Sequence, residues 1–190
     1  MTKTGWKPSA IAMLLAAAAL TLGSAAAAKH AAHRAGGTAA APSTHIYQDW
    51  ELTCPTQDKP KKDASCKLEE DVFDATTHDS LARITILRMK GNDVLDIVLP
   101  HNVLLDPGIG LDFDDATPAL FNFETCDGVG CLVVIPFGGD LADKFEAAAH
   151  PRVLFAGLDG KPVGLPYSML GFREGLEAYR LAERKLAAKH

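Results

Sequence analysis

Apolar and polar residues alternate along residues 45–54, in the stretch HIYQDWELTC. A period of two places successive side chains on opposite faces of an extended chain, which is typical of a half-buried β-strand. The pattern predicts a strand that ends at a cysteine, with Trp50 as a hydrophobic anchor of the core. Its apolar face would comprise Ile46, Trp50, Leu52 and Cys54.

The middle of the chain contains further short stretches rich in β-branched and aromatic residues, separated by turn residues such as the pair Gly91–Asn92. We predict strands at residues 66–68, 82–89, 93–100, 102–108, 111–115, 118–126 and 131–137. Within 118–126 the alternation places Phe121 and Phe123 on the core face. The continuous apolar run of 131–137 is typical of a strand buried on both sides.

Helical periodicity appears in the last third of the chain. Residues 140–150 predict a short helix, and residues 171–186 predict a terminal amphipathic helix with Ser168 as its N-cap. Phe172 would be the second anchor of the core. Residues 152–168, between the two helices, predict a β-hairpin. Many short strands with two helices favour a mainly β fold, a single-domain β-sandwich.

The chain begins with the features of a secretory signal peptide: two lysines, an apolar run over residues 10–23 and small residues at Ala26 and Ala28. The run is too short to cross a bilayer as a helix, so we expect cleavage before Lys29 and no transmembrane segment in the mature chain. The expected division is a signal peptide over 1–28, a flexible linker over 29–43 and one domain over 44–190.

The predicted domain is strongly acidic. The chain has 24 acidic and 19 basic side chains, and four of the basic ones precede residue 44, which leaves 15 basic residues and a net charge of −9. Such a surface repels phosphate backbones, so nucleic acid is not an expected partner. Peripheral association with an anionic membrane surface stays an alternative, because the terminal helix carries basic residues. They are Arg173, Arg180, Arg184, Lys185 and Lys189.

Four cysteines in an exported chain indicate disulfides, because thiols oxidise outside the cytoplasm. Three pairings are possible, and we expect Cys54–Cys66 and Cys126–Cys131, since glycines let the segment CDGVGC fold back on itself. The spacings lack the two-residue knuckle of structural zinc sites. Asp127 disfavours the thiolate that redox chemistry at Cys126 would need. No metal and no cofactor are predicted.

Candidate catalytic groups are few. Asp112, Asp114 and Asp115 could attract Ca²⁺, but the segment lacks the glycine and glutamate of an EF-hand loop. The histidines lack metal-binding spacing, and Ser168 lacks the turn that activates a serine nucleophile. No catalytic residue is therefore predicted. An exported hydrolase that used Asp112, Asp114 or Glu124 stays an alternative, and it needs two carboxylates that converge on a cleft.

Several motifs, taken in order, resemble the invasion-associated locus B family of exported alphaproteobacterial proteins. They are DWELTC, SCKLEE, IVLPHNVLLDPGIGLDFDD, CDGVGC and GKPVGLPYSMLGF, within residues 44–180. The matching positions are Trp50, Cys54, Cys66, Pro100, Val103, Leu105, Gly108, Leu111, Cys126, Gly130, Cys131, Ser168, Gly171 and Phe172. His101 and Asn102 depart from the family pattern, which has a small turn residue there, and the loop around residues 59–62 is longer.

The resemblance implies a periplasmic or surface-associated β-sandwich with no defined catalytic residue, linked in some family members to entry into host cells. We therefore expect a non-enzymatic, exported binding protein whose partner is a protein or an envelope component. Two alternatives stay open: the exported hydrolase, and a periplasmic chaperone or small-ligand carrier with an apolar cavity between its sheets.

Overall fold

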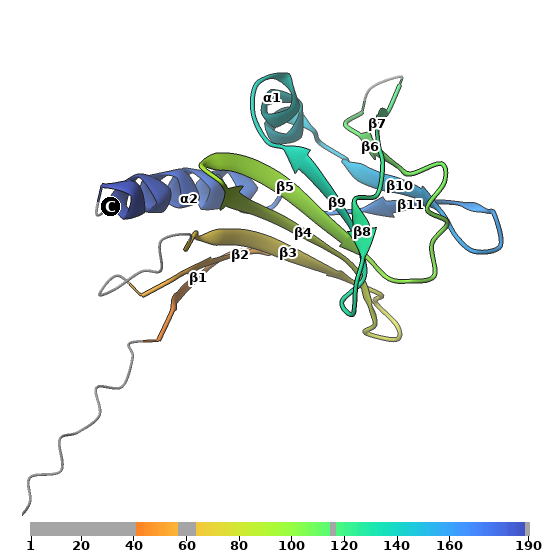
Figure 1. Cartoon of the computed structure of the whole chain (residues 1–190), viewed down its shortest axis with the longest axis horizontal. Helices are drawn as coiled ribbons and strands as arrows, with labels where there is room; N and C mark the ends of the chain where they lie inside the picture. The colour runs from red at the N-terminus through yellow and green to blue at the C-terminus, as the bar shows by residue number, and fades with distance from the viewer. Residues whose placement is uncertain (1–40, 57–63, 115–116, 189–190) are drawn as a thin grey trace, which may run out of the picture. The chain divides into compact units, whose positions relative to one another are not determined.

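A computed structural model describes residues 41–56, 64–114 and 117–188 (Figure 1). The predicted signal peptide and all but the last three residues of the predicted linker lie outside these residues. The elements are β1 (Ser43–Tyr47), β2 (Trp50–Cys54), β3 (Lys67–Phe73), β4 (Ser80–Met89), β5 (Asn92–Leu99), β6 (Ile109–Asp112), β7 (Ala119–Phe121), β8 (Thr125–Cys126), β9 (Cys131–Pro136), α1 (Asp140–Ala147), β10 (Arg152–Ala156), β11 (Pro162–Pro166) and α2 (Phe172–Ala187).

Two antiparallel sheets contain these strands. The larger sheet has seven strands in the order β1-β2-β3-β4-β5-β9-β8, and the smaller has four in the order β11-β10-β6-β7. The longest hairpin, β4–β5, turns at Lys90 and Gly91, which both have left-handed φ angles of 51° and 87°. Such turns match the twist of paired strands. The chain passes between the sheets after β5, after β7 and after β9.

The core lies between one face of the seven-stranded sheet, both helices and the four-stranded sheet, which contributes Ile109, Leu111, Val153 and Leu165. Trp50 and Phe172 are 0% and 1% exposed, and their ring centroids are 4.8 Å apart. Phe145 of α1 packs against Phe172 at 4.9 Å and against Tyr167 at 5.3 Å. This aromatic cluster joins the start of the sheet to both helices, and aliphatic residues of β3, β4, β5 and β9 extend it.

The predicted fold class is confirmed: the protein is mainly β, with two sheets, a short internal helix, a C-terminal helix and two disulfides. The disulfides join Cys54 to Cys66 and Cys126 to Cys131. The first ties the end of β2 to the start of β3, and the second closes the short β8–β9 turn.

The segment predicted as one strand over residues 45–54 is instead the β1–β2 hairpin. The chain reverses at Gln48 and Asp49, and Gln48 has φ 55°, a left-handed conformation uncommon outside glycine. The reversal puts Ile46 opposite Glu51, on the face away from Trp50. Ile46 is 65% exposed, so its predicted place in the core is wrong.

Three other strand predictions also need correction. Residues 102–108 form no strand, and only Val103 makes an isolated bridge, to Gly157. The stretch 118–126 is not one strand but contains β7, which ends at Phe121, and β8, which belongs to the other sheet. Phe121 and Phe123 are half-buried and pack against the core, as their predicted face requires. In β9 the burial alternates along the strand, which contradicts the prediction of a strand buried on both sides.

Candidate functional site

The seven-stranded sheet has one buried face and one open face. Buried side chains such as Trp50 and Leu68 point towards α2, where Trp50 contacts Phe172 and Leu68 borders Gly175. Their neighbours along each strand point to the opposite side. We call that side the outer face. No helix of the described chain packs on it, and Figure 1 shows α2 behind the sheet.

The strand registers place residues of five strands in one row across the outer face. The row consists of Glu51, Glu69, Thr85, Asp96 and Val134. It runs from an acidic region on β2 and β3 to an apolar region on β5 and β9.

The first region, on β2, β3 and β4, is charged and internally paired. Arg83 donates to Asp71 from Nε at 2.7 Å and from Nη2 at 3.1 Å, and its Nε lies 3.5 Å from Glu69. The Thr85 hydroxyl donates to Glu69 at 3.1 Å. These contacts hold the carboxylates of β3 in place, so this part of the outer face is ordered.

The second region, on β5 and β9, is apolar. In an antiparallel sheet with one face in water, each strand alternates apolar residues on the buried face with polar residues on the open face. The outer-face positions of β5 and β9 are therefore expected to be polar. They are instead Val94, Val98, Leu132 and Val134, of which Val98, Leu132 and Val134 are half-buried. Contiguous apolar surface on a folded domain marks a site of interaction.

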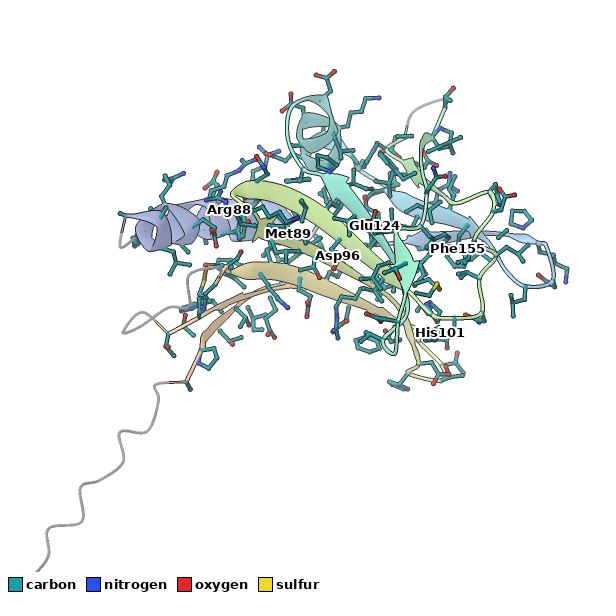
Figure 2. The ribbon with its side chains drawn as sticks, viewed as in Figure 1. Arg88, Met89, Asp96, His101, Glu124 and Phe155 are labelled. Atoms are coloured by element: carbon teal, nitrogen blue, oxygen red, sulfur yellow. A yellow bond between two sulfur atoms is a disulfide. The ribbon has the colours of Figure 1, made fainter. Side chains whose placement is uncertain are left out.

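Asp96 lies where this apolar region meets β4, between Thr85 and Val134 on the neighbouring strands (Figure 2). Its Oδ1 atom is buried and has no hydrogen-bond partner. Burial raises the pKa of its carboxyl, and Lys67 partly opposes this effect. A carboxylate with a buried oxygen that has no hydrogen-bond partner is suited to receive a hydrogen-bond donor or a cation from another molecule.

Pockets flank the two ends of the outer face. One, of about 270 Å³, is lined by Arg83, Val98, Pro100 and Val129 among others. The other, of about 510 Å³, is lined by residues of β3 and β4 that include Lys67, Leu87 and Met89. Figure 2 places Met89 and His101 towards opposite ends of the sheet. The outer face therefore has recesses at both ends.

The disulfide loop forms a wall of the first pocket. The Asp127 side chain accepts the Val129 N–H at 2.8 Å, and His101 donates from Nε2 to the Asp127 carbonyl at 2.6 Å. A Cβ at Gly130 would collide with the Leu99 carbonyl, so only glycine fits there. The loop is thus rigid and presents Val129 to solvent, 70% exposed.

Ser168 has a different role from the predicted N-cap, since the N-cap is Gly171 and α2 begins at Phe172, four residues after Ser168. Its carbonyl accepts Trp50 Nε1–H at 2.9 Å, its N–H donates to Glu70 at 2.8 Å, and its hydroxyl donates to Asp49 at 2.6 Å. Ser168 therefore connects the start of the last helix to β2 and β3.

Glu70, which no sequence motif singled out, is the second acid with an unpartnered oxygen. Glu70 is 6% exposed; its Oε1 accepts the Ser168 N–H, whereas Oε2 is buried without a partner, as is the Tyr167 hydroxyl. Burial raises the pKa of Glu70 from 4.5 to about 7. The sequence signal was the alternation in β3, which puts Glu70 on the same face as buried Leu68.

The Glu70 carboxyl makes stability depend on pH. Because its pKa is higher in the folded state, its contribution is complete below pH 4.5 and is lost as the pH rises through 7. We expect Glu70→Gln to match the wild type at pH 4.5 and to be more stable by about 3 kcal/mol at pH 8. Urea unfolding at both pH values measures this difference.

Glu69→Gln is the matched control, because Glu69 is adjacent but lies on the partly open outer face. Its effect on stability should change less between pH 4.5 and pH 8. A Glu70→Gln variant that is equally destabilised at both pH values would contradict the assignment.

The two aspartates of the hydrolase hypothesis, Asp112 and Asp114, each bind different groups of the protein itself. Asp112 is buried in β6 and accepts Arg152 Nε–H at 3.1 Å. Asp114 accepts the backbone N–H groups of His150 and Ala149, which lower the pKa of its carboxyl. Both aspartates therefore have structural partners.

Glu124 is exposed on the connection between β7 and β8, and no hydrogen bond or ion pair of the described residues joins it to either aspartate. Asp115 lies outside those residues. Across the described ranges, no group of three His, Cys, Asp or Glu side chains could hold a metal ion.

The terminal helix does not have a uniformly basic face. Arg180 pairs with Glu146 at 3.0 Å, and Glu174 and Glu177 are exposed on the same helix as Arg184. Lys189 lies outside the described residues. None of the described helices is both long and apolar enough to cross a membrane.

Comparisons with known proteins agree with this architecture. The family model of the invasion associated locus B (IalB) protein matches residues 50–180. Among solved structures, the crystal structure of invasion associated protein B from Bartonella henselae is similar, with a TM-score of 0.63 and 17% sequence identity. The alignment covers 75% of this chain and 99% of that chain. No curated protein matches. The family match covers well over half of the sequence, so the chain belongs to the invasion associated locus B family.

Proposed function

We propose that this protein is an exported, non-enzymatic binding protein of the envelope or cell surface, and that its outer face binds the partner. The observation that carries the proposal is Asp96, a carboxylate with a buried, unpartnered oxygen, which lies where the apolar region of the outer face meets Thr85. Apolar surface supplies affinity, and a buried polar group supplies specificity because a mismatched partner leaves it unsatisfied.

The chemistry of the outer face also favours a class of partner. Val98, Leu132 and Val134 form an apolar surface without a deep cavity at its centre, which fits a protein or another extended envelope component better than a small molecule. The carboxylates of Glu51, Glu69 and Asp96 in the central row favour a partner with a basic or hydrogen-bond-donating group.

Export is supported by the predicted signal peptide over residues 1–28 together with two disulfides, which persist in oxidising compartments. A periplasmic or surface location would place the outer face among envelope components. The name of the similar Bartonella protein suggests that host cells are one setting for such binding.

A non-enzymatic role is supported by the fact that the candidate acids bind different partners within the protein. Asp112 pairs with Arg152, and Asp114 accepts backbone N–H groups, so neither carboxylate is available as a proton donor or acceptor in a shared cleft. The space where a carrier would hold a ligand is occupied by the rings of Trp50, Phe145 and Phe172.

Site-specific photo-crosslinking in the exporting bacterium tests the proposal. We expect a photoreactive residue at Val98 or Val134 to give one discrete adduct with an envelope component, and Asp96→Lys to reduce its yield about tenfold or more. The matched control position is Leu158, which is 64% exposed at the β10–β11 turn and should give no such adduct. Equal adducts from Leu158, or none from the outer face, would exclude this binding surface.

A further inference from the structure

The two sheets have four outer strands, three of which are protected against pairing with another chain. β7 and β8 are three and two residues long, and β11 begins at Pro162 and ends at Pro166. Short length and proline both prevent edge pairing. β1 has five residues, mostly exposed, without proline or a formally charged Lys, Arg, Asp or Glu side chain. No strand of the described chain pairs with its outer edge.

A groove of about 600 Å³ borders this open edge, between Tyr47 of β1 and one side of α2. Its helix residues recur every one to three positions, and they are Glu174, Glu177, Ala178, Arg180, Leu181 and Arg184. Leu181 is 47% exposed there. A strand added to β1 would place alternate side chains next to this groove, which is the geometry of β-strand addition.

Charges along this side of α2 are separated by sign. Glu174 and Glu177 lie in its first half, whereas Arg184 and Lys185 lie in its last turn. Among the described residues, none of these four side chains takes part in an ion pair. Within the described chain, Glu174 and Glu177 therefore supply unpaired acidic charge at one end of the groove, and Arg184 and Lys185 supply unpaired basic charge at the other. Arg173 is also exposed in the first turn but does not line the groove, and Arg180, between the two ends, pairs with Glu146.

The direction of α2 relative to β1 is set at both ends. A Cβ at Gly171 would collide with the Tyr47 carbonyl, so the helix begins beside the end of β1. Near its other end, Glu183 accepts the Cys66 N–H at 2.6 Å. Cys66 is bonded to Cys54, which pairs with Ser43 at the start of β1. The helix thus runs antiparallel to β1.

We propose that β1 pairs antiparallel with β1 of a second copy of this chain, which joins the two seven-stranded sheets through a two-fold axis. Antiparallel pairing of the strands makes the two α2 helices antiparallel as well. The acidic end of each helix then faces the basic end of the other, and the symmetry repeats each favourable contact twice. The same partner would pair with the open edge of β1, cover the groove beside it and neutralise the charges at the two ends of α2.

Charge variants of the exported chain test this arrangement by sedimentation velocity over a concentration series. We expect the wild type to form a dimer. Glu174→Arg/Glu177→Arg makes both ends of this side of α2 basic, and Arg184→Glu/Lys185→Glu makes both ends acidic, with Arg180 between them paired with Glu146. Each variant alone should self-associate about tenfold or more weakly, because like charges then face each other. An equimolar mixture of the two should recover the dimer as a heterodimer.

A second pair of variants tests the strand edge. Thr44→Lys on β1 should weaken the dimer about tenfold, whereas Val163→Lys on β11 is the matched control and should leave it unchanged. Circular dichroism of each variant shows whether it has folded. A wild type that stays monomeric overturns the proposal, and so does a dimer that is insensitive to Thr44→Lys or a mixture that does not associate. If the wild type is monomeric and dimerises only after residues 29–40 are removed, the occupant of the β1 edge is that segment and not a second copy.

Discussion

Replacing Trp50 by alanine is expected to lower the free energy of unfolding by about 3–5 kcal/mol. The indole is fully buried, packs against Phe172 and Phe145, and donates Nε1–H to the Ser168 carbonyl at 2.9 Å. The substitution removes apolar contacts, leaves a cavity and deprives that carbonyl of its donor. Such a loss is a large share of the stability of a domain of this size. Denaturant unfolding of the oxidised protein measures it.

Ile46→Ala is the matched control, because Ile46 lies on the neighbouring strand but is 65% exposed. Its cost should stay within about 0.5 kcal/mol. A Trp50→Ala variant that unfolds at the same denaturant concentration as Ile46→Ala would show that the aromatic cluster does not stabilise the fold.

Removing the Cys54–Cys66 disulfide by a double alanine substitution is expected to cost about 3 kcal/mol. The bond spans 12 residues of sequence, and its loss returns the entropy of that loop to the unfolded chain. It also frees the start of β3, where the Cys66 N–H donates to Glu183 of α2. Equilibrium unfolding of the double variant and the wild type gives the difference.

The Cys126–Cys131 pair provides the comparison, since it spans only 5 residues and its removal is expected to cost about 2 kcal/mol. Reducing agent should bring the wild type to the level of a variant that lacks all four cysteines. If removing Cys126–Cys131 lowers the free energy of unfolding more than removing Cys54–Cys66, loop entropy does not determine which disulfide stabilises the protein more.

Local patterns in the sequence predicted most elements because the residues that decide them are close together. The period of two in β2, β4 and β5 follows from one buried face, and Leu176 and Tyr179 follow Phe172 at helical spacing on α2. The disulfide pairs were also predictable, since neighbouring cysteines closed short loops. These features depend on few contacts outside their own segments.

Features that depend on tertiary structure could not be predicted in this way. The reversal at Gln48 uses a left-handed residue that is neither glycine nor asparagine, so no turn signal marks it. The split of 118–126 between β7 and β8 follows from which sheet each half joins. Asp96 and Glu70 look like ordinary strand acids until the register shows what surrounds them.

Contacts between the two ends of the domain constrain how a newly synthesised chain can fold. The hydrogen bonds from Trp50 to Ser168 and from Cys66 to Glu183 span 118 and 117 residues. Bringing such distant residues together is slow, because most of the chain must be ordered first. β1 to β3 leave the ribosome long before the 16 residues of α2, so their apolar faces stay uncovered until synthesis is nearly complete. Loss of the last helix would therefore leave a nascent chain that cannot close its core, open to proteases and aggregation.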